Sequence, residues 1–307
     1  MTQNYIGVDL SKDWLDIFNP REGHDRIRNT DTDIRRWLAG LSDQDLIVFE
    51  ATSLCDGRIL RLASAHGRPF HRLNPLHGWH FARSLNLPKT DRVDARMLSR
   101  MGAERRLAPS ACYDAARAGL AELNMRRDQI KRMETQEKNR LAKAASASVR
   151  ADIRSLLSVL AGRIKRIEAQ IAAFLQAHPD LAGQVRRLES LPGVGRVVSV
   201  TLLCHMPELG RCDRRQIASL GGLAPRARES GQWRGRRFIG EGRRHVRRAL
   251  YLAALSAMRV GGICPDMVNR MRAAGKPGKV IAIAVARKLL TIANALIRDR
   301  NMYQAKA

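Results

Sequence analysis

The sequence predicts an α/β domain followed by a mainly α-helical remainder. Over residues 1–105, short apolar runs of strand length alternate with amphipathic helical segments. From about residue 114 the pattern changes to long helices rich in Ala, Arg, Glu and Lys. We therefore expect an α/β domain at 1–105, a helical coiled-coil region at 106–180, and a mainly helical C-terminal domain at 181–307.

The N-terminal domain is expected to contain a mixed sheet. Its first two strands are joined by a hairpin around Ser11 and Lys12, and the later strands are separated by helices. The predicted strands are 5–9, 14–18, 46–50 and 69–73. The predicted helices are 31–41, 59–66 and 90–102.

Four carboxylates lie at the ends of these elements. Asp9 closes one apolar strand and Glu50 closes another, so both can project from the same end of the sheet. Asp91 and Asp94 are three residues apart, which places them on one face of a helix. Their mutual repulsion is reasonable if a cation binds between them, and Mg²⁺ prefers a few carboxylates completed by phosphate oxygens. The four acids therefore predict a Mg²⁺ site.

A simpler interpretation of the same acids needs no metal. Lys89, Arg92 and Arg96 flank the acidic pair and can neutralise it by themselves. Lys89 and Arg92 are also candidates for contacts with nucleic acid.

The charge of the chain points to a polyanionic partner. The sequence holds 55 Lys+Arg against 29 Asp+Glu, a formal net charge of +26. Residues 1–100 are nearly neutral, with 15 basic and 13 acidic side chains, whereas residues 186–300 hold 24 basic and 7 acidic. A field of this sign attracts nucleic acid. An acid-rich domain joined to a strongly basic one is expected of a protein that cuts or joins it.

Other sequence features exclude some classes of protein. No run approaches about 18 consecutive apolar residues and no signal-peptide pattern is present, so we expect a cytoplasmic protein with no membrane contact. The cysteines are odd in number and none are spaced Cys-x-x-Cys, which predicts neither a disulfide framework nor a zinc ribbon. They are Cys55, Cys112, Cys204, Cys212 and Cys264.

The middle region has the apolar pattern of a coiled coil. The stripe is spaced alternately by four and three residues, as a/d positions are. It consists of Ile153, Leu157, Leu160, Ile164, Ile167, Ile171 and Phe174. An earlier arm around Leu120 and Ile130 is less regular, and the small residues at 144–147 are expected to separate the two arms. The arms form either an antiparallel hairpin or a dimerisation device.

The C-terminal domain opens with a glycine turn. Leu191-Pro192-Gly193-Val194-Gly195 has the form of a helix-hairpin-helix turn. In such a turn Gly193 and Gly195 allow backbone N–H groups to approach a phosphate, although turns of this form also occur without a ligand.

A glycine- and arginine-rich segment at 221–248 surrounds Ser230-Gly231. A serine that attacks a phosphodiester needs an exposed hydroxyl and nearby guanidinium groups to stabilise transition-state charge. Ser230 is therefore a candidate nucleophile, although Ser-Gly in a polar loop is normally a turn. The arginines expected to bind nucleic acid are Arg226, Arg228, Arg234, Arg236, Arg237, Arg243, Arg244, Arg247 and Arg248.

In this order, the motifs resemble a known family. The runs 6–12, 50–52 and 89–96 resemble the RuvC-like, or ribonuclease-H-like, domain of the DEDD-type transposases of bacterial insertion sequences. The runs 191–195, 222–225, 230–231, 247–251 and 275–290 resemble the second, transposase domain of that family. The resemblance spans nearly the whole chain. It departs after Thr52, where the chain continues Ser53-Leu54 and the family has a glycine and then an aromatic residue.

The resemblance implies a mechanism. Members of the family are recombinases guided by a structured bridge RNA, which pairs with donor and target DNA. By resemblance, Asp9, Glu50, Asp91 and Asp94 hold Mg²⁺, and Ser230 forms a covalent phosphoserine link with the DNA. The two domains are expected to form a composite site between subunits of a dimer or tetramer.

Three functions are consistent with these features. The favoured one is an RNA-guided transposase of an insertion sequence. A site-specific DNA invertase of the same family is the second, and a non-catalytic nucleic-acid-binding protein with the same fold is the third.

Overall fold

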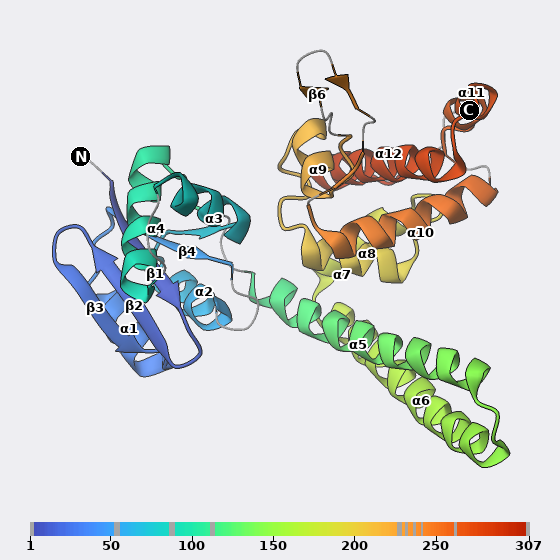
Figure 1. Cartoon of the computed structure of the whole chain (residues 1–307), viewed down its shortest axis with the longest axis horizontal. Coiled ribbons are helices and arrows are strands. Elements are labelled where there is room, and N and C mark those ends of the chain that lie inside the picture. The colour runs from blue at the N-terminus through green and yellow to red at the C-terminus, as the bar shows by residue number, and fades with distance from the viewer. Residues whose placement is uncertain are drawn as a thin grey trace. The chain divides into compact units, whose positions relative to one another are not determined.

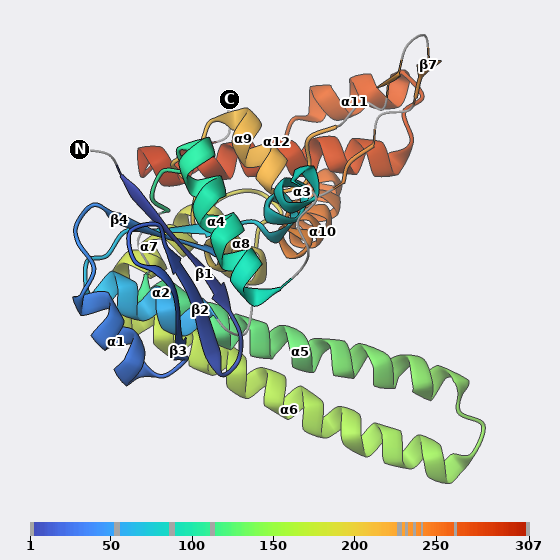
Figure 2. The same ribbon diagram turned by 60° about the vertical axis from the view of Figure 1, so that its left-hand side comes forward.

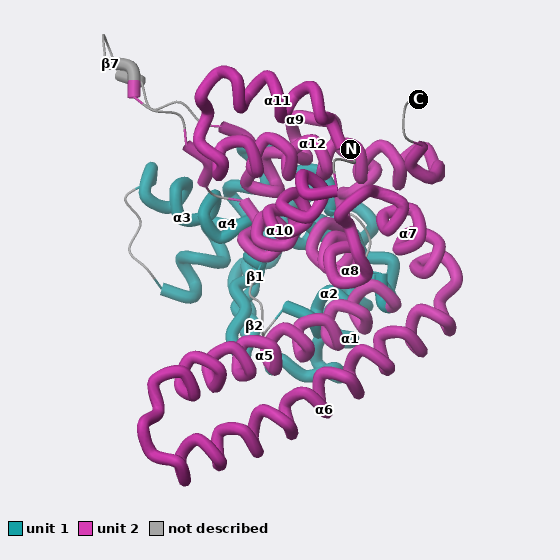
Figure 3. Tube along the Cα trace, turned by 90° about the vertical axis from the view of Figure 1, so that its right-hand side faces the viewer, with its two compact units in different colours: residues 1–115 teal, residues 116–307 magenta. Residues whose placement is uncertain are grey.

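The structure is a computed structural model of the chain. It describes residues 3–51, 56–85, 90–110, 114–225, 229–230, 233–235, 238–240, 242–260 and 263–304, and for 229, 230, 233 and 234 the backbone alone. The chain divides into two compact units, residues 1–115 and 116–307 (Figure 3). The three-part division expected from the sequence stays a prediction.

The first unit is built on a five-stranded mixed sheet (Figure 1). Its order is β3-β2-β1-β4-β5, with β1 antiparallel to β2 and parallel to β4. The mixed sheet expected from the sequence is confirmed, as is the β1–β2 hairpin, where Ser11 caps the turn by accepting from the Trp14 N–H at 3.0 Å. The strands are β1 Asn4–Leu10, β2 Trp14–Asn19, β3 Gly23–Arg28, β4 Asp45–Glu50 and β5 Phe70–Leu73.

Two elements of this unit are absent from the sequence prediction. Strand β3 lies at the sheet edge, and its mostly exposed polar side chains give no apolar alternation. Helix α3 is Pro75–Ser84, and it begins at an Asn74 cap with proline in its first turn. Its apolar residues are separated by His77, Gly78 and His80, so the sequence shows no clear helical stripe.

Helices cover both faces of the sheet. The helices α1 Asp31–Ala39 and α2 Asp56–Ala65 pack on the face that holds Ile6, Val8 and Leu15. Helices α3 and α4 (Asp91–Arg105) pack on the face that holds Leu46 and Val48. The described part of the chain thus has a three-layer α/β architecture in this unit.

The second unit begins with a long helical hairpin (Figure 2). Helix α5 is Ala115–Lys143 and α6 is Ala147–Ala177, so the break falls at the small residues where the sequence predicts it. Ile130 packs with Leu160 and Ile164 along the arms. Of the two arrangements considered, the chain adopts the antiparallel hairpin.

The remainder of the second unit is a helical core. The base of the hairpin belongs to it through Leu120, Ile171 and Leu175. Helix α12 lies at its centre, with residues such as Val285 and Leu289 fully buried. The helices are α7 Pro179–Glu189, α8 Arg196–His205, α9 Arg214–Leu220, α10 Arg244–Val260, α11 Pro265–Ala273 and α12 Gly278–Asp299.

Helix α12 is also the one helix in the described ranges that is long and apolar enough to cross a membrane. Half of its most apolar window is buried inside the protein, and the helix packs in the core of the second unit. A short hairpin of β6 (Glu229–Ser230) and β7 (Trp233–Arg234) joins α9 to α10.

Cys204, Cys212 and Cys264 are free thiols, while Cys55 and Cys112 lie outside the described residues.

Candidate active site

Three of the four predicted acids line one cleft of the first unit. Asp9 from β1, Glu50 from β4 and Asp94 from α4 border a cavity of about 600 Å³. Residues separated by two in a strand share a face, so Asp9 lies on the face of Gly7, and Glu50 on that of Val48. This is the face that α3 and α4 cover. Strand alternation and the two helices thus bring the three carboxylates together.

The position of α4, and hence of Asp94, depends on Gly7. A Cβ at Gly7 would lie 1.9 Å from the carbonyl oxygen of Ala95 and 2.6 Å from the Ser99 nitrogen. The helix backbone therefore rests directly on β1, where only glycine leaves room. The Ser99 hydroxyl also donates to the Tyr5 carbonyl at 2.6 Å. This close approach places the first turn of α4 beside the end of β1.

A second glycine leaves room for Glu50. A Cβ at Gly78 of α3 would lie 2.0 Å from Glu50 Oε1. The Glu50 carboxylate thus passes over the helix backbone at a point where a side chain is absent. Helix α3, which the sequence does not predict, therefore helps to set the position of a predicted site residue.

The electrostatics of the cleft are those of crowded carboxylates. The pKa of Asp9 is raised to about 6, first by burial and then by the nearby charges of Asp94, Asp91 and Asp16, against a backbone hydrogen bond from Leu10 that lowers it. Desolvation and like charges both disfavour the ionised form. A cation bound at the cleft would relieve this repulsion.

Asp91 does not line the cleft. Its side chain is 64% exposed, and it accepts from Arg26 Nη2 at 3.1 Å. Arg26 of β3 also makes a bidentate pair with Asp16, at 2.9 and 2.8 Å. Among the described residues, no three acidic, histidine or cysteine side chains lie close enough to enclose a metal ion.

The metal-free interpretation stays a prediction for the acidic pair as a whole, and the structure gives Asp91 a basic partner that this interpretation did not name. Asp91 is paired with Arg26, not with the flanking Arg92. Arg96 lies instead over the Phe18 ring, at 5.6 Å from its centroid, and Lys89 is outside the described residues. Asp16 and Arg26 escape sequence reasoning because a cross-strand register brings them to the site, with Asp9 opposite Asp16 and Asp16 opposite Arg26.

The cleft also contains side chains that the sequence analysis does not single out. Trp79 and Arg83 of α3 line it together with the acids. The Trp79 side chain is 50% exposed, and the Arg83 guanidinium lies 4.9 Å from its ring centroid. The cleft therefore combines carboxylates, an exposed indole and an arginine.

In the second unit, the predicted glycine turn does join two helices, α7 and α8. Gly193 has φ +81°, and a Cβ there would lie 2.6 Å from the Ala253 carbonyl oxygen and 2.6 Å from the Ala257 nitrogen. Gly193 is therefore explained by its conformation and by its packing on α10, without a ligand. Gly195 is exposed at the start of α8 with open space around it.

The predicted nucleophile lies in the β6–β7 hairpin. The backbone of Ser230 pairs with Trp233, and that of Glu229 with Arg234. The side chains of Ser230 and Arg234 are outside the described part of the structure. Also outside it are Arg226, Arg228, Arg236 and Arg237.

The remaining predicted arginines differ in environment. Arg243 forms a bidentate ion pair with Glu208, with Nη2 to Oε1 at 2.6 Å, and the pair lowers the pKa of Glu208 despite its burial. Arg243 is thus engaged within the protein. On α10, Arg244 and Arg248 are exposed and Arg247 is half-buried.

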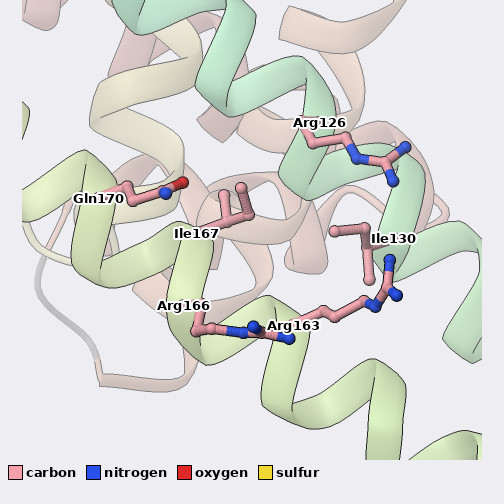
Figure 4. A pocket seen from close by; sticks show the side chains of 6 residues that line it. All are labelled: Arg126, Ile130, Arg163, Arg166, Ile167 and Gln170. Carbon is pink, nitrogen blue, oxygen red and sulfur yellow. The ribbon is translucent and has the colours of Figure 1, made fainter.

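A basic groove that the sequence does not single out lies between the arms of the hairpin (Figure 4). Ile130 and Ile167 form its apolar part, and Arg126, Arg163 and Arg166 project around them, with a volume of about 340 Å³. Arg126 donates to Gln129 at 3.1 Å. Within the described ranges, Arg163 and Arg166 have no acidic partner.

Comparison with known proteins identifies the chain's relatives. The model described as "Transposase IS116/IS110/IS902 family" matches residues 185–268, and an IS110-type DEDD transposase model matches residues 6–147. The chain is 28% identical over 323 residues to the pilin gene-inverting protein of Moraxella bovis, covering 100% of this chain and 99% of that protein.

Proteins of insertion elements match one portion of the chain. The 43.6 kDa protein of insertion element IS110 from Streptomyces coelicolor is 31% identical over 154 residues, 50% of this chain and 37% of that protein. The 42 kDa protein of IS900 from Mycobacterium paratuberculosis is 32% identical over 123 residues, 37% of this chain and 29% of that protein. The chain thus belongs to the IS116/IS110/IS902 family of transposases and is a DNA recombinase.

Proposed function

We propose that the acid cleft is the metal-dependent catalytic site of this recombinase. The observation that carries the proposal is the convergence of Asp9, Glu50 and Asp94 on one cleft, where burial and the neighbouring carboxylates raise the pKa of Asp9. Carboxylate oxygens suit Mg²⁺, which also takes substrate phosphate oxygens as ligands. Asp91 would join the set by leaving Arg26, which retains Asp16 as a partner.

The acids of the cleft and Arg26 would have different roles toward the metal ion. When bound, Mg²⁺ polarises phosphoryl oxygens and stabilises the charge that develops on them. Asp9 and Glu50 would hold it from the sheet, and Asp94 would hold it from α4. Arg26 neutralises Asp16 beside them, so that the negative charge of Asp16 does not displace the carboxylates of Asp9, Glu50 and Asp94.

A charge-neutral substitution tests this proposal. Asp94→Asn is expected to abolish recombination on a plasmid substrate while retaining DNA binding, because the strongly basic surface lies elsewhere in the sequence. Asp43→Asn is the matched control, since Asp43 is a fully exposed carboxylate of the same unit paired only with Arg68. Recombination by Asp94→Asn at the rate of the control would end the metal-site proposal.

We propose further that Ser230 is the nucleophile. Its Oγ would form a bond to phosphorus while the bond to the leaving DNA oxygen breaks and that oxygen takes a proton. The ester conserves the bond energy, so the reverse step rejoins DNA without an external energy source. The support is the position of Ser230 in a hairpin within an arginine-rich segment.

Covalent trapping tests the serine step. A nicked suicide substrate should leave DNA attached to the wild-type protein but not to Ser230→Ala, with the adduct on the peptide that contains Ser230. Asp91→Asn should also block the adduct if acids and serine form one composite site. An adduct on another residue would refute the assignment.

The partners we propose are donor and target DNA and a structured guide RNA, bound by a homodimer or homotetramer. The net charge of +26 supports a polyanionic partner without distinguishing its kind. Sequencing the RNA that co-purifies with the protein tests guidance. One defined RNA encoded beside the gene supports it, and random cellular RNA counts against it.

DNA inversion is the second candidate function, and one observation favours it. The similarity to the Moraxella pilin gene-inverting proteins spans the whole chain, whereas the insertion-element proteins match half of it or less. The DNA around the gene discriminates the two. A mobile element recurs at several genomic sites, whereas an invertase gene lies beside one segment found in both orientations.

A further inference from the structure

The cleft of the three acids has an aromatic part that the chemistry proposed above does not use. Trp79 lies on α3, whose buried residues are Gly78 and Phe81, so the indole points away from the core of the unit. The guanidinium of Arg83 lies over one face of its ring, 4.9 Å from the centroid, and the His80 ring meets the indole at 72° with the two centroids 4.9 Å apart. Half of the residue's surface nevertheless stays exposed.

An indole that is half exposed beside a catalytic cleft has the properties of a stacking platform. Leaving a large aromatic surface in water forgoes the stabilisation that its burial would give. A ligand that covers the indole recovers this stabilisation. Because Arg83 adds a positive charge next to the ring, the fitting ligand has a flat aromatic part and an anionic part. A nucleotide has both, and the cleft volume of about 600 Å³ lies within the usual range of small-ligand sites.

Stacking on Trp79 places a condition on the strand in the cleft. In an intact duplex each base is covered on both faces by its neighbours, so no face is open to a side chain. Proteins that stack aromatic residues on bases do so with unpaired or flipped nucleotides. We infer that Trp79 stacks on an unpaired base next to the reacting phosphodiester, while Arg83 contacts its phosphate. The inference rests on the proposed function of the acid cleft, and makes Trp79 a positioning residue.

Photo-crosslinking of the full chain tests this inference. The probe is a 12-nucleotide oligothymidylate in which 5-iododeoxyuridine replaces thymidine, so that every binding register presents a reactive base. Irradiation should attach the single strand to the peptide that contains Trp79, and the same strand in a blunt duplex should give much less of this product. Equal yield from the duplex would overturn the requirement for an unpaired base.

The variants include a matched tryptophan. Trp14 is 40% exposed in the same unit and also lies under an arginine, Arg28 at 5.7 Å, but it does not line the acid cleft. At about 0.3 M salt, where phosphate contacts are weakened, Trp79→Ala should lower the affinity for oligothymidylate about 5- to 150-fold, the range expected for one lost stack. Trp79→Phe should restore most of the affinity, and Trp14→Ala should leave it unchanged.

The two proposals fail in different ways. If Asp94→Asn recombines normally but the Trp79 crosslink forms, the metal site is wrong and the platform stands. If Asp94→Asn is inactive but no crosslink reaches the Trp79 peptide, the platform is wrong and the metal site stands. Equal affinity losses in Trp79→Ala and Trp14→Ala would also refute the platform, because the effect would then not depend on the cleft.

Discussion

Gly78→Ala isolates the contribution of Glu50 without touching a charged group. The new methyl carbon would lie 2.0 Å from Glu50 Oε1, whereas nonbonded carbon and oxygen atoms keep at least about 3.2 Å apart. The carboxylate must therefore move by about 1 Å. A displacement of this size in a catalytic group can lower the rate about 100-fold, and we expect such a fall in the recombination rate.

The fold itself should tolerate this substitution. The atoms in the way, Glu50 Oε1 at 2.0 Å and Cδ at 3.1 Å, are the end of a flexible side chain, and the next residue is Leu73, with Cδ2 at 3.3 Å. Alanine in place of glycine also favours a helix by up to about 1 kcal/mol. The free energy of unfolding, measured by urea titration followed by circular dichroism, should thus stay within about 1 kcal/mol of wild type.

The matched control is Gly57→Ala in α2, where an added Cβ meets nothing within 4 Å. It should leave recombination unchanged in the same plasmid assay. A Gly78→Ala protein that is folded and recombines at the wild-type rate would refute the reasoning, because Glu50 would then tolerate displacement. A Gly57→Ala protein that is equally impaired would also refute it.

Three further predictions follow from other features. Asp9→Asn should stabilise the metal-free protein at pH 8 by about 1–2 kcal/mol after allowing for solvent screening, and much less at pH 4. Because the folded-state pKa of about 6 exceeds the ordinary value of 3.8, the destabilisation of the wild type by the ionised Asp9 develops as pH rises between these values. Equal gains in thermal melts at both pH values would contradict this prediction. The double variant Arg163→Ala/Arg166→Ala should lower the slope of log affinity against log salt by about 1–2 units, measured by fluorescence anisotropy with duplex DNA. The control variant Arg154→Ala/Lys165→Ala removes equal charge outside the groove. The same slope change in the control would show that only net charge matters. Gly193→Ala should destabilise the protein by at least about 2 kcal/mol in urea titrations, because position 193 has a positive φ and an added Cβ would clash with the backbone of α10. Gly195→Ala should have little effect. Equal effects of the two substitutions would contradict the packing argument.

The sequence was sufficient to predict those residues of the candidate site whose positions follow from local strand and helix patterns. Asp9 and Glu50 could be proposed because each closes an apolar strand, and Asp94 because it lies three residues after Asp91 on one face of a predicted helix. Asp16, Arg26 and Trp79 were not found. The first two reach the site through strand register, and β3 shows no apolar alternation because its side chains face water. Apolar periodicity in a sequence indicates which side chains are buried. An exposed edge strand and a helix interrupted by Gly78 show little of this periodicity, so neither is predicted from it.

The helical hairpin gives this recombinase a built-in length. Helix α6 has 31 residues, which at 1.5 Å per residue is about 46 Å. Duplex DNA rises 3.4 Å per base pair, so the whole helix, including its last turns in the core, is as long as roughly 13 base pairs. Because Ile130, Leu160 and Ile164 lock the two arms together, the length is fixed rather than adjustable. The hairpin therefore holds its tip at a fixed distance from the helical core.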